Sequence, residues 1–311
     1  MSGSELSQTR AWVMAARPQT LPAAAAPIVV GAGLAWYDGV FAFLPAVAAF
    51  IGAALIQIGT NFANDYYDAI QGADTDAREG FTRVTQSGLI APESVKQAMY
   101  LTFAAAIGVG SYLVYVGGLP ILVIGLLSVV SGIAYTGGPY PLGYHGLGDL
   151  FVFVFFGVIA VMGTYYVQAT DVLAAPLSMT IPPNTITWTA FLASLPVAAL
   201  STNILVVNNI RDREEDATTG KRTLAVRFGY TFSRLQYTGL VALAYLVPVW
   251  LWLAEGFGPT VLLPLLTVPI AVVVSWTVWT QTAGIALNPA LETTGKLLAA
   301  YSLLFGLGLA L

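Results

Sequence analysis

The chain has 311 residues, of which 57% are hydrophobic and only 9% are charged, and its mean hydropathy is +0.76. Soluble globular domains carry about 25% charged residues, so this composition excludes that class and indicates a membrane protein. The net charge of −4 and the lack of a dense basic patch exclude nucleic acid as a partner. The absence of cysteine excludes disulfides, thiol nucleophiles and thiolate metal sites.

The N-terminal residues 1–10 are polar and lead directly into an apolar stretch. No clear small-residue cleavage site follows, so we expect no cleaved signal peptide and expect the first helix to be retained. A crossing takes about 20 apolar residues, which leaves room for roughly nine or ten crossings. No separate soluble domain fits, so we expect one intramembrane domain over residues 1–311.

Nine transmembrane helices are predicted in chain order from apolar runs bounded by charges and by Gly or Pro. They cover residues 18–36, 41–63, 97–116, 119–135, 147–168, 186–207, 233–253, 261–279 and 296–311. The predicted fold class is therefore an all-α polytopic membrane protein, with nine transmembrane helices around a central cavity.

The basic residues predict the orientation of these helices. Alternating crossings place the N-terminus and the segments near 64–96, 136–146, 208–232 and 280–296 on one side of the membrane. All twelve basic residues lie on that side: Arg10, Arg17, Arg78, Arg83, Lys96, Arg211, Arg213, Lys221, Arg222, Arg227, Arg234 and Lys296. The positive-inside rule therefore predicts a cell-membrane protein whose N-terminus and motif loops are cytoplasmic.

Two short acidic motifs follow the second and the sixth predicted helix. They are Asn64-Asp65-Tyr66-Tyr67-Asp68 and Asn208-Asn209-Ile210-Arg211-Asp212 with Asp216. Nine of the 16 acidic residues fall in or just after them, which packing alone does not require. Four crossings separate the motifs, so they have the same orientation and form a parallel repeat. We expect them to face each other across the central cavity.

Helical spacing brings the carboxylates of each motif to one point. Residues three and four apart share a helix face, so Asn64 aligns with Asp68, and Asn208 aligns with Asp212 and Asp216. Carboxylates this close at the edge of a membrane favour a cation between them. Oxygen ligands without His or Cys favour Mg²⁺.

A phosphate-bearing amphiphile is the predicted substrate. Mg²⁺ completes its shell with substrate phosphate oxygens, and basic residues beside the motifs take up the remaining phosphate charge. Polyprenyl diphosphate fits a phosphate at the edge of an apolar cavity. Aromatic faces would shelter the allylic cation that forms as diphosphate departs, and Tyr135, at the cytoplasmic end of the fourth helix, is a candidate substrate contact.

Ordinary structural roles are the alternative for some of these residues. Asp and Asn at helix ends also serve as caps, and basic residues beside a membrane helix also serve as topology signals. His145, the single histidine, is expected to be a loop residue, since nothing pairs with it at metal or triad spacing. A cation transporter would place its carboxylates near the bilayer midplane between broken helices, whereas here they lie at helix ends.

Four segments together resemble the intramembrane UbiA prenyltransferase superfamily, and within it the 1,4-dihydroxy-2-naphthoate polyprenyltransferases. They are Ala16-Arg17-Pro18-Gln19-Thr20-Leu21-Pro22, Asn64 through Asp76 with Arg78, Tyr135 through Tyr144, and Asn208 through Leu224. The resemblance implies a UbiA-like fold in the membrane lipid and Mg²⁺-dependent transfer of a polyprenyl chain from polyprenyl diphosphate to 1,4-dihydroxy-2-naphthoate. Diphosphate and CO2 would leave, and demethylmenaquinone would form. Other acceptors within the fold are 4-hydroxybenzoate, a haem precursor or a glycerol phosphate lipid.

The same resemblance implies roles for individual residues. The implied metal ligands are Asn64, Asp65, Asp68, Asn208, Asp212 and Asp216, among which Asp68 and Asp212 are the expected catalytic carboxylates. The implied diphosphate contacts are Arg17, Arg78, Arg83 and Lys221. Gly72 stands where the first motif of the family often continues with a third acid, and Asp74 or Asp76 is the expected replacement.

Overall fold

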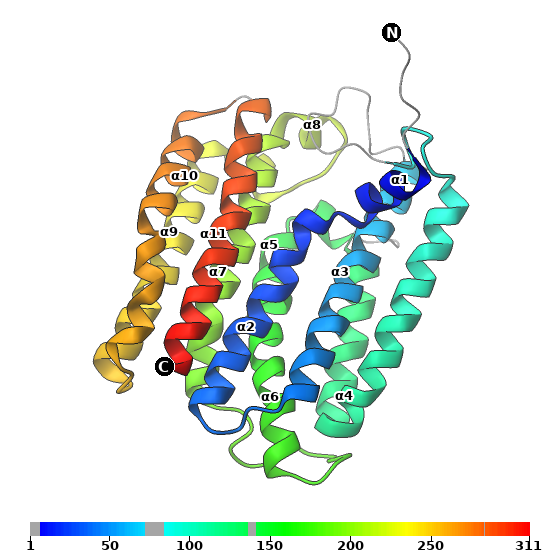
Figure 1. Ribbon diagram of the computed structural model, residues 1–311. Coiled ribbons are helices and arrows are strands. Elements are labelled where there is room, and N and C mark those ends of the chain that lie inside the picture. Colours follow the sequence, from blue (N-terminus) through cyan, green and yellow to red (C-terminus); the bar gives the residue numbers. More distant parts are fainter. Residues whose placement is uncertain (1–6, 72–83, 136–140, 283) are drawn as a thin grey trace.

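The computed structural model describes residues 7–71, 84–135, 141–282 and 284–311, and every regular element within these ranges is a helix (Figure 1). Eight helical stretches in the described chain are long and apolar enough to cross a membrane. They are Gln8–Tyr37, Phe43–Ile70, Pro92–Ala134, Gly148–Leu173, Trp188–Arg211, Leu224–Ala254, Pro259–Thr280 and Gly284–Ala310. The prediction of an all-α polytopic membrane protein is confirmed.

The elements of the first half form one side of a single bundle. They are α1 (Gln8–Ala16), η1 (Pro18–Thr20), α2 (Leu21–Tyr37), α3 (Phe43–Gln71) and α4 (Pro92–Ala134). The short helix α1 lies across the upper end of the bundle in Figure 1 and packs on α3.

The second half supplies the remaining elements. They are η2 (Leu142–His145), α5 (Gly148–Val152), the π-helical η3 (Phe153–Ile159), α6 (Ala160–Leu173), α7 (Trp188–Arg211), α8 (Arg213–Thr218), α9 (Leu224–Ala254), the 3₁₀ segment η4 (Pro259–Thr267), α10 (Val268–Thr280) and α11 (Gly284–Ala310). Helix α8 lies at the same end of the bundle as α1, whereas the C-terminus lies at the opposite end (Figure 1).

Helix α4 is 43 residues long because it contains two crossings joined by a reversal at Gly118. Gly118 has φ 68° and ψ −156°, a combination that glycine adopts readily and other residues rarely do. Backbone hydrogen bonds of 2.9 Å, from Leu119 N to Ser178 O and from Leu177 N to Tyr115 O, fix the turn. With α4 counted twice, the eight stretches of the described chain make the nine crossings predicted from hydropathy.

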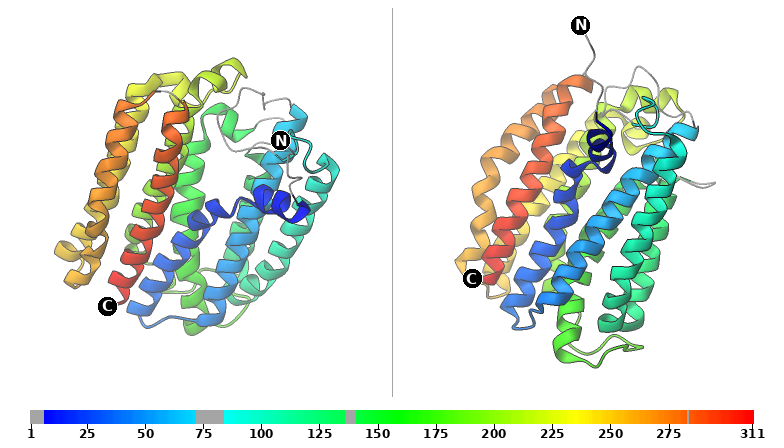
Figure 2. Two further views of the ribbon diagram at one scale, coloured as in Figure 1. Left: turned by 45° about the horizontal axis from the view of Figure 1, so that its top comes forward. Right: turned by 45° about the vertical axis from the view of Figure 1, so that its right-hand side comes forward.

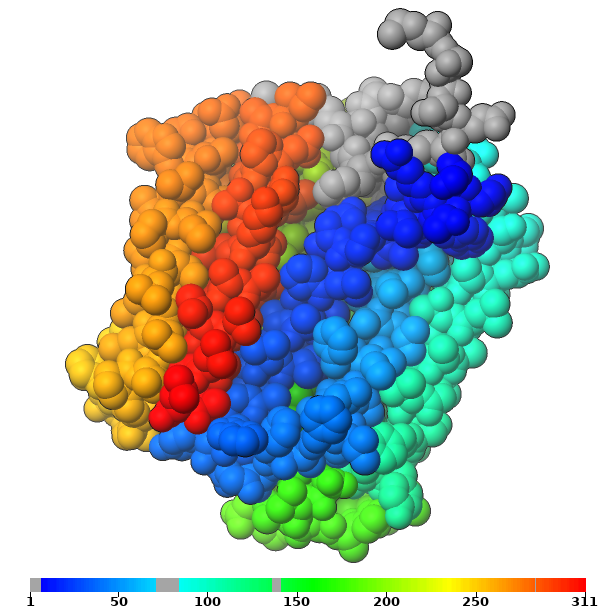
Figure 3. Space-filling view, in the orientation of Figure 1, coloured from blue at the N-terminus to red at the C-terminus, as the bar shows by residue number. Residues whose placement is uncertain are grey.

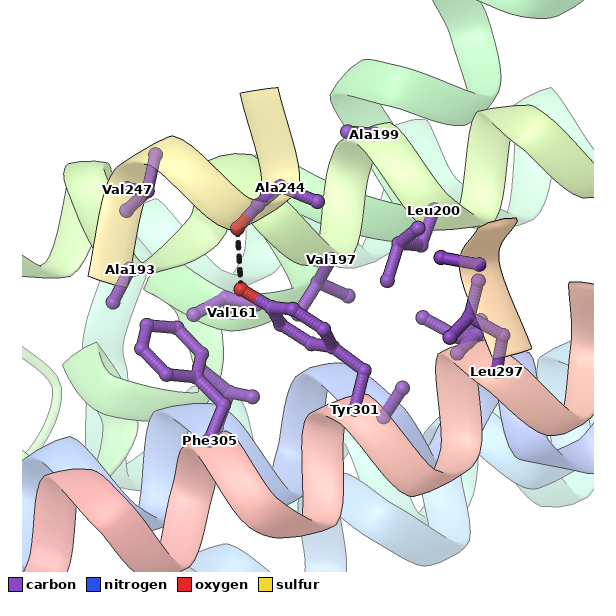
Figure 4. Close-up of a cluster of buried hydrophobic side chains, with 14 of the residues drawn as sticks. Val161, Ala193, Val197, Ala199, Leu200, Ala244, Val247, Leu297, Tyr301 and Phe305 are labelled. Carbon is purple, nitrogen blue, oxygen red and sulfur yellow. Dashed lines mark hydrogen bonds between the residues drawn. The ribbon is translucent and has the colours of Figure 1, made fainter. Parts of the chain in front are cut away.

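Helix α7 lies at the centre of the largest buried core. In its apolar segment 78% of the residues are buried, against 22% in α4 and 33% in α3. Figure 4 shows how Val197 and Leu200 of this helix pack beside Tyr301 and Phe305 of α11. The Tyr301 hydroxyl donates a 2.5 Å hydrogen bond to the Ala244 carbonyl oxygen of α9, so the polar tip of this buried ring is satisfied.

Helices α2 and α11 close the bundle on one face by direct backbone contact. A Cβ added at Gly33 would lie 2.2 Å from the carbonyl oxygen of Gly306, a distance no side chain tolerates. Small residues allow such close approach between membrane helices. The two helices lie side by side in Figures 1 and 2, and the space-filling view shows them against each other along the lower half of this face (Figure 3).

Several helices extend further on the motif side than predicted. Helix α3 runs to Gln71 rather than 63, and α11 begins at Gly284 rather than 296. Helix α9 begins at Leu224 rather than 233, but its first turn is a separate piece, because Gly229 (φ 82°, ψ −179°) is not helical. Helices α1 and α8 were not predicted at all. Hydropathy marks only the part of a helix inside hydrocarbon, whereas intrahelical hydrogen bonds continue into the aqueous edge.

Candidate active site

Both acidic motifs line one polar cavity of about 940 Å³. Helix α3 contributes Asn64 and Asp68 near its carboxyl end. The second motif contributes Asn208 and Asp212 at the end of α7 and Asp216 in α8. Because the carboxyl ends of α3 and α7 lie at the same end of the bundle, side chains 144 residues apart in sequence share one space (Figure 1).

The two carboxylates of the first motif face different ways. Asp68 is 2% exposed, lines the cavity and accepts a 2.9 Å hydrogen bond from the Tyr144 hydroxyl. Asp65 is 1% exposed but does not line the cavity. Its Oδ2 accepts hydrogen bonds from the Thr85 hydroxyl at 2.6 Å and from the Thr85 backbone N–H at 3.2 Å. The structure therefore places Asp65 as an anchor for the chain around Thr85 and does not bring it to the other predicted ligands.

Arg17 reaches the cavity from the turn between α1 and η1. This residue has φ 51° in the left-handed region, and its carbonyl oxygen accepts from the Thr20 hydroxyl at 2.8 Å. Two side chains of α3 hold the turn, because Asn61 donates to the Ala16 carbonyl and to the Thr20 hydroxyl at 2.9 Å, and Gln57 donates to the same hydroxyl at 3.1 Å. These contacts fix Arg17 at the wall that also carries the first motif.

Arg211 is the central cation of the second motif. Its Nε and Nη2 donate to the two carboxylate oxygens of the adjacent Asp212, at 2.6 and 2.7 Å. Nη2 also donates to Asn208 Oδ1 at 2.6 Å, and Nη1 donates to Asn288 Oδ1 of α11 at 3.2 Å. The sequence interpretation used Arg211 only as a topology signal, so this role was missed. The neighbouring acid one residue away was the available clue.

A line of polar contacts joins the two motifs. Lys221 Nζ lies 3.7 Å from Asp216 Oδ1 and 4.8 Å from the centre of the Tyr144 ring. Tyr144 in turn donates to Asp68, as described above. Lys221 therefore lies at the cavity beside the second motif, which is compatible with the diphosphate contact expected for it. Tyr144 lies in one of the resembling segments, but no property of the sequence alone marked its hydroxyl.

Tyr135 lines the cavity at the carboxyl end of α4. Burial raises the pKa of its hydroxyl well above the usual value of 10, and the carboxylates of Asp149, Asp216 and Asp68 raise it further. The side chain is therefore a neutral phenol at neutral pH, and it presents a hydrogen-bond donor and an aromatic face rather than a base.

A buried carboxylate supports the second motif from behind. Asp149 of α5 is 6% exposed and does not line the polar cavity. Its Oδ1 accepts from Asn209 Nδ2 at 3.1 Å, and its Oδ2 accepts from Gln236 Nε2 at 3.0 Å. Because a carboxylate only accepts, the bond from Asn209 fixes the amide orientation of that side chain, which lines the polar cavity.

An apolar cavity of about 540 Å³ adjoins the polar one. It is lined by residues of α2, α3, α4, α5, η3 and α6, and Phe151 and Phe155 on its wall stack with ring centres 4.4 Å apart. The two cavities share the lining residues Ala23, Gln57, Asn64, Tyr135, Val152 and Phe156. The combined space suits a molecule with a charged head and a long apolar tail.

The oxygen donors of the polar cavity suit a hard divalent cation. Five of the six predicted ligands line it, and all five offer carboxylate or amide oxygens that can bind a metal ion. Within the described ranges no three Asp, Glu, His or Cys side chains converge on a point. Arg211 and Lys221 instead pair with Asp212 and Asp216. Such a donor set fits Mg²⁺ bound together with a phosphate ligand, because Mg²⁺ usually takes only one or two carboxylates.

Several predicted site residues lie outside the described residues. They are Arg78 and Arg83, predicted as diphosphate contacts, and Gly72, Asp74 and Asp76 at the end of the first motif.

Comparison with known proteins identifies relatives over nearly the whole chain. The sequence profile of the UbiA prenyltransferase family matches residues 24–291. The 1,4-dihydroxy-2-naphthoate octaprenyltransferase of Escherichia coli (strain K12) is 36% identical over 330 aligned positions, which cover 100% of this chain and 98% of the relative. The enzyme of the same name from Mycobacterium tuberculosis is 37% identical, with 94% of each chain covered.

Solved structures share the fold. A UbiA homologue from Archaeoglobus fulgidus bound to DMAPP and Mg²⁺ superposes with a TM-score of 0.60, at 13% sequence identity, over 94% of this chain and 98% of that one. At this identity the likeness shows the arrangement of helices, which is that of the bundle described above.

Proposed function

The chain belongs to the UbiA prenyltransferase family, and from this premise we propose that it transfers a polyprenyl chain from polyprenyl diphosphate to 1,4-dihydroxy-2-naphthoate. Diphosphate and CO2 leave, and the product is the reduced, quinol form of demethylmenaquinone. The names of the relatives from E. coli and M. tuberculosis support the naphthoate acceptor. We further propose that the motif side is cytoplasmic and that the chain lies in the cell membrane, because the basic residues gather on that side.

The observation that carries the proposal is the shared boundary of the two cavities. Asp68 and Asp212 line the polar cavity, and Tyr135 and Phe156 line both it and the apolar cavity. A prenyl diphosphate placed across this boundary has its charged head among the acidic and basic side chains and its tail among apolar ones. Its reacting allylic carbon then lies where the two surroundings meet.

In this proposal the oxygen donors of Asn64, Asp68, Asn208, Asp212 and Asp216 hold Mg²⁺, and Arg17 and Lys221 contact the diphosphate. Arg78 and Arg83 are further proposed contacts from the sequence. When bound, Mg²⁺ neutralises the negative charge that develops on the departing diphosphate. Asp65 stays behind the cavity wall and supports the first motif through Thr85.

The reaction needs one bond broken on the donor and one on the acceptor. The bond between the allylic carbon and the diphosphate oxygen breaks, and its electron pair leaves with diphosphate. The faces of Tyr135 and Phe156 stabilise the allylic cation, and the neutral Tyr135 hydroxyl does not trap it as a phenolate would. The ring carbon that carries the carboxylate then forms the new carbon–carbon bond with the allylic carbon. Loss of CO2 returns an electron pair to the ring.

The test is turnover by purified protein in detergent with labelled polyprenyl diphosphate, 1,4-dihydroxy-2-naphthoate and Mg²⁺. We expect a labelled prenylated naphthoquinol and its loss on addition of EDTA, with recovery when excess Mg²⁺ is restored. Parallel reactions with 4-hydroxybenzoate, a haem precursor and a glycerol phosphate lipid identify the acceptor. Product only with one of these contradicts the naphthoate assignment, and product unaffected by EDTA contradicts the metal.

A further inference from the structure

Arg211 covers the oxygen atoms that the proposed function assigns to the metal at the second motif. Its side chain is 2% exposed, and its guanidinium donates to both oxygens of Asp212 and to Asn208 Oδ1. Four of the five N–H donors of an arginine are thereby engaged at one end of α7, counting the bond to Asn288. A cation is thus already present at the predicted metal position, and it belongs to the chain itself.

The surroundings distinguish this contact from an ordinary surface ion pair. Surface pairs contribute little, because water competes with them, whereas Arg211 and Asp212 are both less than 9% exposed as residues. Arg213, two residues further on, shows the ordinary case. It pairs with Glu214, whose side chain is 75% exposed, and it does not line the polar cavity.

A divalent cation and this guanidinium are competitors for Asp212. Like charges a few ångströms apart repel each other strongly at the low effective dielectric of a buried site. Mg²⁺ therefore binds Asn208 and Asp212 well only if the guanidinium moves away or another anion neutralises it. The diphosphate head of the substrate is such an anion, and arginine binds phosphate oxygens through the same planar fork that it uses for a carboxylate.

We propose that Arg211 is an exchangeable counter-cation of the second motif: it holds Asn208 and Asp212 before substrate binds, and it transfers its hydrogen bonds to the diphosphate as Mg²⁺ takes those oxygens. This inference rests on the proposed function and adds to it a sequence of events, in which Arg211 holds the second motif first and the diphosphate afterwards. Metal binding at the second motif and diphosphate binding become linked, since each makes the other more favourable. Arg211 thereby becomes a substrate contact in addition to a partner of Asp212.

Mn²⁺ titration followed by electron paramagnetic resonance tests the proposal without measuring turnover. The purified protein in detergent is titrated with Mn²⁺ alone and again in the presence of inorganic pyrophosphate. The variants are Arg211→Gln, the matched control Arg213→Gln, and Arg211→Lys. The lysine variant keeps the charge but cannot bond to both Asp212 oxygens and Asn208 at once, and it replaces the glutamine variant if that one does not fold.

The expected result is tighter Mn²⁺ binding by Arg211→Gln without pyrophosphate, by about tenfold, together with a smaller gain in affinity when pyrophosphate is added. Arg211→Lys should shift in the same direction by less, and Arg213→Gln should match the wild type in both titrations. Unchanged or weaker Mn²⁺ binding by the two Arg211 variants without pyrophosphate overturns the inference and leaves the proposed function intact. Absence of Mn²⁺ binding in every protein, with and without pyrophosphate, overturns the proposed metal and the inference with it.

Discussion

The two acidic motifs have the same spacing in the sequence but different surroundings in the fold. The first is carried by α3, which is one-third buried, and its Asp68 accepts a hydrogen bond from the Tyr144 hydroxyl. The second ends α7, the most buried of the candidate spans within the described residues, and its Asp212 is paired with a guanidinium from its own motif. The repeat therefore keeps the residue types and their spacing, whereas the burial of the helix that carries each motif differs. We infer that the second motif is the more rigid half of the site.

Removal of one carboxylate from each motif gives the largest expected effect. Asp68→Ala and Asp212→Ala should each lower turnover about 10³-fold or more, because each removes a proposed metal ligand worth several kcal/mol in the transition state. Both proteins should remain folded in detergent. Glu214→Gln, at an exposed acid of the same region, is the control and should retain turnover. Near-normal turnover in both alanine variants would remove the metal assignment for both motifs.

Loss of the buried carboxylate behind the second motif tests whether that half is the rigid one. Asp149→Ala leaves the amide donors of Asn209 and Gln236 without their acceptor, and it should lower the unfolding free energy by about 1–3 kcal/mol. Thermal unfolding in detergent measures the change in midpoint. The exposed Asp171→Ala is the matched control and should not shift it. An unchanged midpoint in Asp149→Ala would mean that this carboxylate does not brace α7 against α9.

The link between the two motifs is tested by Tyr144→Phe. The variant keeps the ring beneath Lys221 but loses the hydrogen bond to Asp68, so kcat/KM for the prenyl diphosphate should fall about tenfold. Tyr166→Phe is a suitable control, because it removes a hydroxyl bonded to the Gly117 carbonyl oxygen far along the chain from either motif. Equal kcat/KM values in both variants and in the wild type would show that Tyr144 does not orient Asp68 during the reaction.

The smallest effect is expected in the core of the second half. Tyr301→Phe removes one buried hydrogen bond, to the Ala244 carbonyl, and should cost about 1 kcal/mol of unfolding free energy with turnover unchanged. The thermal midpoint and a turnover assay measure the two quantities on one preparation. A clear drop in turnover would mean that the core around α7 affects the active site directly, contrary to this prediction.

Much of the architecture could be predicted because every crossing of the membrane takes about 20 apolar residues. Apolar runs are sufficient to predict nine helices. The twelve-to-zero distribution of basic residues is sufficient to predict which helix ends lie on the same side of the membrane. Even the reversal at Gly118 coincides with the predicted break between 116 and 119. Hydropathy could not mark the extra turns of α3 and α11 on the motif side, where water and neighbouring loops satisfy polar side chains.

The candidate site was predictable only in part, for a different physical reason. Spacing along one helix shows which side chains share a face, and it brought Asn64 with Asp68 and Asn208 with Asp212. It could not show that Asp65 turns to Thr85, which lies 20 residues away in the sequence. The contacts of Asp149 and Tyr144 span 60 or more residues, so only the packed bundle reveals them.

The glycine contact between α2 and α11 joins two helices that both reach the site. The main chains of the two helices touch where Gly33 meets Gly306, and no space remains there for a side chain. Helix α2 carries Ala23, which lines both cavities, and α11 carries Asn288, which bonds to Arg211. A methyl group added at Gly33 would therefore force apart two helices that both line the polar cavity, although neither glycine lines it.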